Sequence, residues 1–86
     1  MLSVKATLER ILAAEADANI RFADVQRLLV RLGFAQRVRG DHFIYTREGV
    51  EEIINNQPRG AKAKPYQVRH ARGLIVKYAL VLEDEE

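Results

Sequence analysis

The sequence of residues 33–46, GFAQRVRGDHFIYT, gives the clearest signal for the fold class. Its two halves, residues 34–39 and 42–46, alternate in character, and in a β-strand side chains two positions apart share a face. The second half therefore places Phe43 and Tyr45 on one face of a strand. Between the halves, Gly40 and Asp41 form a turn signal. We predict a short β-hairpin over this stretch.

Before and after the hairpin, the apolar residues no longer alternate and instead recur at helical spacing. They predict helices over residues 4–16, 22–32 and 65–78. Ser3 suits the position before the first helix, because its hydroxyl accepts a hydrogen bond from a free backbone amide. Gly33 suits the end of the second helix, where the backbone often turns left-handed. Pro65 suits the first turn of the third.

The segment Val50–Gln57 permits two interpretations. Glu51 and Glu52 suit a helix, whereas Ile53, Ile54 and the flanking turn signals suit a strand. We predict a strand, because a lone two-stranded hairpin is only marginally stable in water.

The elements then follow the order α, then α-β-β-β-α. A three-stranded antiparallel sheet with helices packed on one face is an α+β fold, and this topology is that of double-stranded RNA-binding domains. We divide the chain into an extra N-terminal helix at 1–18, the α+β domain at 19–80 and an acidic tail at 81–86. We expect the extra helix to pack on its own domain, with packing on another chain as the alternative.

Three apolar stripes are predicted to face the core. They comprise Val4, Leu8, Ile11 and Leu12 in the first helix, Val25, Leu28, Leu29 and Leu32 in the second, and Val68, Ala71, Ile75 and Tyr78 in the third.

Composition excludes several classes of protein. The 86 residues contain no cysteine, which excludes a disulfide scaffold, a thiol nucleophile and a cysteine zinc site. The two histidines lie far apart in the chain, so we expect no metal and no cofactor. No apolar run approaches the ~20 residues of a membrane-spanning helix, and the N-terminus lacks a signal-peptide layout. We expect a cytoplasmic protein that does not bind membranes.

Charge is distributed unevenly along the chain. The net charge is +2, yet four of the twelve acidic residues are the last four, Glu83–Glu86. Residues 59–77 contain no acidic residue and six basic ones: Arg59, Lys62, Lys64, Arg69, Arg72 and Lys77. Such a block favours a polyanionic partner, most simply a nucleic acid. The alternative is a basic helix face that is merely solvated.

Three segments resemble the HicA family, the toxin half of a bacterial toxin–antitoxin pair. They are Gly33-Phe34, the hairpin Arg39–Tyr45, and Gly60-x-Lys62-x-Lys64-Pro65 before a basic helix. The resemblance covers about residues 20–78. It implies a double-stranded-RNA-binding-like fold, metal-independent cleavage of mRNA, and neutralisation by a HicB-type antitoxin. Two features depart from the family pattern: Asp41 replaces the serine of its Gly-Ser-His, and the N-terminal helix is additional.

His42 is the candidate catalytic residue. Cleavage of RNA by its own 2′-hydroxyl needs a group that takes up a proton, and histidine titrates in the useful range. The candidate RNA-binding residues are Arg39, Lys62, Lys64, Arg69 and Arg72, whose charges would hold phosphates. Gly40 and Asp41 form the turn beside His42. His70 is interpreted as a solvated side chain.

Three other functions stay open. A non-catalytic RNA-binding module would result if Asp41 marks a lost activity. A partner-binding domain would use the extra helix. A winged-helix DNA-binding domain is disfavoured, because the hairpin falls between the helices and not after them.

Overall fold

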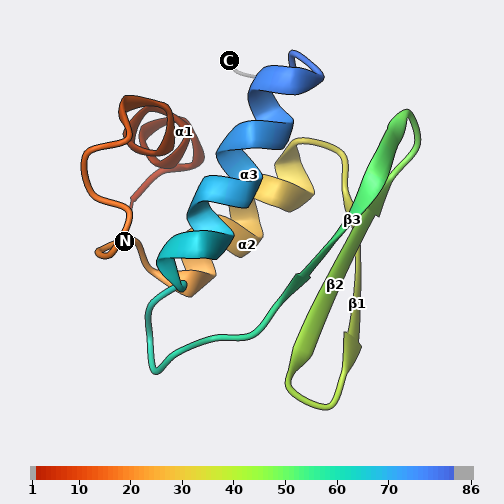
Figure 1. Ribbon diagram of the computed structural model, residues 1–86, viewed down its shortest axis with the longest axis horizontal. Helices are drawn as coiled ribbons and strands as arrows, with labels where there is room; N and C mark the ends of the chain where they lie inside the picture. Colours follow the sequence, from red (N-terminus) through yellow and green to blue (C-terminus); the bar gives the residue numbers. More distant parts are fainter. Residues whose placement is uncertain (1, 83–86) are drawn as a thin grey trace.

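Three helices and three strands make up the computed structural model, which describes residues 2–82. In chain order they are α1 (Val4–Ala13), α2 (Phe22–Arg31), β1 (Ala35–Arg39), β2 (His42–Arg47), β3 (Val50–Asn56) and α3 (Pro65–Lys77) (Figure 1). The predicted order of elements is confirmed, including the third strand. The acidic residues Glu83–Glu86 lie outside the described residues.

The strands form one antiparallel sheet in the order β1-β2-β3. Directly opposed residues share a face, so the register separates the sheet into two surfaces. The inner face carries Tyr45 and its partner Ile54, both fully buried. The open face carries Arg39 opposite His42, and Ile44 opposite Asn55. This division leaves His42 on the side of the sheet that faces away from α1, α2 and α3 (Figure 1).

The helices form two layers on the inner face. Helices α2 and α3 lie between the sheet and α1 (Figure 1). The start of α2 meets the sheet through Phe22 and Phe43, whose rings pack edge to face with centroids 5.2 Å apart. A single core joins all the layers. The structure thus has the predicted α+β architecture, with α1 added on the far side of the other two helices.

Helix α1 begins where it was predicted to begin and ends earlier. The Ser3 hydroxyl accepts a hydrogen bond from the amide of Ala6 at 3.0 Å, which is the predicted cap. The helix stops at Ala13, three residues short of the prediction, because Ala14 turns left-handed with φ +57°. Helices α2 and α3 each end one residue earlier than predicted.

Ile11 is fully buried, and through it α1 packs against the core. The prediction that Leu12 also faces the core is wrong, since Leu12 is 45% exposed. Successive helix positions are ~100° apart, so positions 4, 8 and 11 share a face that position 12 leaves. Thr7 occupies that buried face instead and donates its hydroxyl to the carbonyl of Ser3 at 2.9 Å. The extra helix therefore packs on its own domain.

A polar cluster connects β3 to the end of α3. Glu52 accepts hydrogen bonds from Lys77 and from the Tyr78 hydroxyl, both at 2.7 Å. These bonds favour the carboxylate, chiefly the one from Lys77, and lower the pKa of Glu52 from 4.5 to about 2.

Stability is expected to depend on this cluster at acidic pH. A carboxyl whose pKa falls on folding stabilises the folded state above its unfolded pKa, and this contribution disappears as pH falls towards the folded pKa. Replacing Glu52 by glutamine should therefore lower the free energy of unfolding most above pH 4.5, and the deficit should vanish near pH 2. Urea unfolding across this range measures it, with Glu51→Gln on the same strand as control. A deficit independent of pH would contradict the prediction.

Candidate nucleic-acid interface

The turn between β1 and β2 places His42 at one end of the open sheet face. Gly40 adopts φ +62°, a conformation that glycine reaches without the steric cost of a side chain. The turn closes directly on the pair Arg39 and His42. Side chains of directly opposed residues in an antiparallel pair are neighbours. The predicted catalytic histidine and one predicted RNA-binding arginine therefore lie side by side.

The imidazole of His42 is held from the neighbouring strand. Its Nδ1 lies 2.9 Å from Oδ1 of Asn55 on β3. An amide oxygen can only accept a hydrogen bond, so the neutral ring carries its proton on Nδ1 and a lone pair on Nε2. The side chain is 48% exposed. Nε2 is thus the nitrogen that is open to take up a proton.

Asp41 lies beside that nitrogen, with its Oδ1 3.8 Å from Nε2 of His42. Its other oxygen, Oδ2, accepts a hydrogen bond from Nε2 of Gln57 at 2.6 Å. This bond is the main reason why the pKa of Asp41 lies below its ordinary value, and the nearby charges of His42 and Lys64 act in the same direction. At neutral pH the side chain is therefore a carboxylate, and its negative charge lies beside the imidazole of His42.

The buried side-chain amide of Gln67 connects the end of β3 to the start of α3. Gln67 is 1% exposed. Its Nε2 donates to the carbonyl of Gln57 at 3.1 Å, and its Oε1 accepts from the amide of Lys64 at 3.2 Å. Buried polar groups must be hydrogen-bonded or they destabilise the fold, so Gln67 holds the end of β3 against the first turn of α3. Figure 1 shows the β1–β2 turn and the start of α3 at the same end of the molecule.

The predicted basic residues divide into two groups. Arg39 lies next to His42, and Lys64 lies within electrostatic reach of Asp41. Lys62 is exposed in the loop before α3, where its backbone bonds to that of Arg59. Arg69 is exposed on α3, where its charge reaches Asp17. His70 is exposed, in agreement with its interpretation as a solvated side chain.

Arg72 has a structural role that its position in the sequence did not indicate. Its guanidinium forms two hydrogen bonds with the carboxylate of Asp17, each 2.9 Å long, and a third with the carbonyl of Ile11 at 3.0 Å. The bond from Arg72 is the main cause that lowers the pKa of Asp17. Arg72 thus fastens the end of α1 to α3, and its charge is already paired with a carboxylate. Its role as a phosphate contact stays a prediction, and it would compete with the pairing to Asp17.

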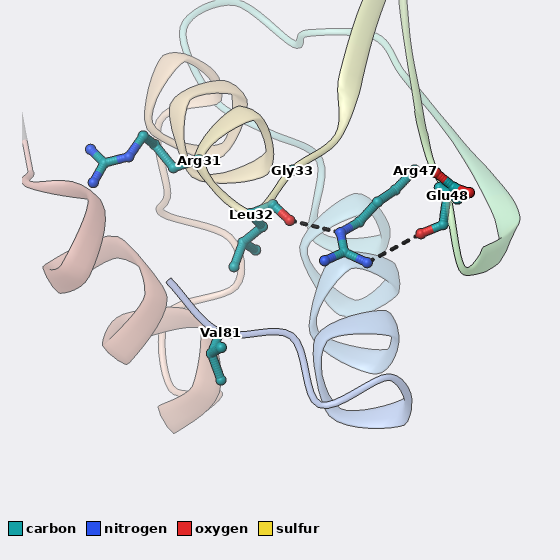
Figure 2. A pocket seen from close by; sticks show the side chains of 6 residues that line it. All are labelled: Arg31, Leu32, Gly33, Arg47, Glu48 and Val81. Carbon is teal, nitrogen blue, oxygen red and sulfur yellow. Dashed lines mark hydrogen bonds between the residues drawn. The ribbon is translucent and has the colours of Figure 1, made fainter. Parts of the chain in front are cut away.

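Two further arginines, Arg31 and Arg47, line a hollow of about 490 Å³ at the end of α2. Arg47 donates from Nε to the carbonyl of Leu32 at 2.8 Å and from Nη1 to that of Glu48 at 3.3 Å. Figure 2 shows Arg31 and Arg47 on opposite sides of the hollow, with their guanidinium groups well apart. Arg47 satisfies a carbonyl at the end of the helix, so we interpret the hollow as structural.

Gly33 makes this approach of Arg47 possible. It has φ +100°, as expected for the residue after a helix, and a Cβ here would lie 3.0 Å from Nε of Arg47.

Within residues 2–82, His, Asp and Glu side chains nowhere gather in groups of three that could hold a metal ion. None of the helices in that range combines the length and the apolar character needed to span a membrane.

Sequence reasoning missed the residues that orient the site. Asn55 and Gln57 hold His42 and Asp41, and Gln67 supports Gln57. Strand pairing brings Asn55 to His42 over 13 positions of sequence. These residues had only an indirect signal in the sequence, because Asn55, Asn56 and Gln57 follow the apolar residues Ile53 and Ile54 of the third predicted strand.

Comparison with known proteins adds no relative: no protein-family model, no curated protein and no solved structure matches the chain.

Proposed function

We propose that the protein is an RNA-binding endoribonuclease that cleaves mRNA without a metal ion. The observation that carries the proposal is the position of His42. Its Nδ1 lies 2.9 Å from Oδ1 of Asn55, and its side chain is 48% exposed. Asp41 lies 3.8 Å from Nε2, and Arg39 is the residue opposite His42 on β1. In the HicA family, which the sequence resembles, such a protein is the toxin of a toxin–antitoxin pair. We extend the proposal to action on mRNA in the cytoplasm and neutralisation by a HicB-type antitoxin.

His42 would act as the general base of the reaction. The 2′-hydroxyl of a ribose gives its proton to Nε2 while its oxygen attacks the adjacent phosphorus. The bond from phosphorus to the 5′-oxygen breaks, and solvent supplies the proton of the leaving hydroxyl. The products are a 2′,3′-cyclic phosphate and a 5′-hydroxyl end. Asp41 stabilises the imidazolium, and Arg39 with Lys64 neutralises the charge that develops on the phosphate.

The test is incubation of a mixed mRNA with the purified protein in EDTA. We expect fragments that end in 2′,3′-cyclic phosphate, because the proposed chemistry uses the ribose hydroxyl as nucleophile. RNA that is bound and remains intact would contradict the nuclease and leave an RNA-binding protein.

A second candidate function is a non-catalytic RNA-binding module, and Asp41 favours it. This carboxylate is held in its charged form 3.8 Å from Nε2, where it would repel a phosphate that approaches the base. The resembled family has serine at this position, and a hydroxyl can donate to a phosphate oxygen.

The variant Asp41→Ser separates the two functions. If Asp41 prevents catalysis, the variant should cleave mRNA in EDTA where the wild-type protein does not. The control is Glu48→Ser, which removes an exposed acid from the other hairpin turn. An inactive Asp41→Ser protein that still binds RNA would contradict the idea that Asp41 alone suppresses the activity.

A further inference from the structure

Tyr66 is an aromatic side chain without a packing role. It lies in the first turn of α3 and is 54% exposed. The other aromatic residues are buried or packed: Phe43 contacts the ring of Phe22, and Tyr78 bonds to Glu52. Tyr66 is the single aromatic residue among the exposed large apolar side chains of residues 2–82. Tyr66 does not belong to the core cluster, so its ring is accessible to a ligand.

The surroundings of Tyr66 are cationic. Lys62 and Lys64 precede it, and Arg69 follows three positions later. Residues at this last spacing lie on the same side of a helix. Two acids approach from other elements, Asp41 towards Lys64 and Asp17 towards Arg69. The charge of Asp17 is already paired with Arg72, so the surface around the ring keeps an excess of positive charge.

The first turn of α3, which carries Tyr66, lies at the same end of the molecule as the turn beside His42 (Figure 1). Gln67 in this helical turn bonds to Gln57, and Gln57 in turn bonds to Asp41 in the hairpin turn. An RNA strand that extends from His42 past Lys64 would reach the first turn of α3, where Tyr66 is exposed.

We propose that Tyr66 stacks on an unpaired nucleobase, so that the RNA bound here is single-stranded across the first turn of α3. The inference rests on the proposed RNA binding and identifies the class of RNA. Every base has a π-face that an aromatic ring can cover, and basic side chains around the ring hold the backbone. In a duplex the bases stack on each other, and no face is free.

The experiment measures binding to RNA that cannot be cleaved. A fluorescent 2′-O-methyl oligonucleotide of roughly 10 nucleotides, within the usual range of site sizes, is titrated single-stranded and as a duplex. Tyr66→Ala should weaken binding of the single strand about 5- to 150-fold, the range for loss of one stacked base, and leave duplex binding nearly unchanged. Tyr66→Phe should bind like the wild type. Val76→Ala, another exposed apolar side chain on α3, is the control.

Two results would overturn the inference, and they differ in what else they affect. If the wild-type protein binds single-stranded RNA and Tyr66→Ala binds it equally well, stacking is absent while the proposed function stands. If the wild-type protein binds neither RNA, the proposed function fails together with the inference.

Discussion

Replacement of His42 by alanine is expected to reduce RNA cleavage by about 10²- to 10⁴-fold at saturating RNA, the usual contribution of a positioned general base. Binding should change little, because the cationic neighbours Arg39 and Lys64 remain. The rate is measured in EDTA with enough protein to bind all of the RNA, so that a change in affinity does not enter the comparison.

The matched control is His70→Ala. His70 is also an exposed histidine, but it lies on α3, where it is not part of the group around Asn55 and Asp41. We expect this variant to retain the wild-type rate at saturation. Equal rates for the wild type and His42→Ala would remove His42 from the mechanism, even if the protein proved to be a nuclease.

Replacement of Ile11 by alanine is expected to lower the free energy of unfolding by about 2–5 kcal/mol, the cost of a cavity at a buried aliphatic position. Ile11 is fully buried where α1 meets the core. Total stability of a domain is about 5–15 kcal/mol, so one substitution in the added helix should weaken the whole fold. Urea denaturation measures the change.

Leu12→Ala is the matched control, since it removes a side chain of similar size at the next position, which is exposed. Exposed substitutions usually change stability by about 0.5 kcal/mol or less. Similar losses in both variants would contradict the orientation of α1. No loss in either would mean that α1 contributes nothing to the stability of the domain.

The predictable part of the fold depended on local signals. The hairpin followed from its alternation and from Gly40, and the start of α3 followed from Pro65. The third strand needed one further argument, because its pattern alone also permitted a helix. The end of α1 could not be predicted, since the left-handed turn at Ala14 uses a residue type that normally continues a helix.

Residues of the site could be predicted only where the residue type itself indicates a function. A histidine next to a turn and a run of lysines can be recognised in sequence. The structure pairs Arg39 with His42 and brings Lys64 within electrostatic reach of Asp41. The pairing of Arg72 with Asp17 could not be predicted, because the two residues are 55 positions apart. Asn55 was missed because strand register, which no local pattern specifies, brings it to His42.

We expect RNA to occupy the end of the molecule that is formed by the β1–β2 turn and the start of α3. Mapping the RNA-binding surface by NMR tests this most directly. Amide and histidine NMR spectra are recorded while a single-stranded 2′-O-methyl RNA is added, because this RNA lacks the attacking hydroxyl and stays intact. We predict that the largest shifts fall on residues 39–42, on Asn55 and on Lys64. Shifts confined to other surfaces, such as the hollow beside Arg47, would contradict this expectation.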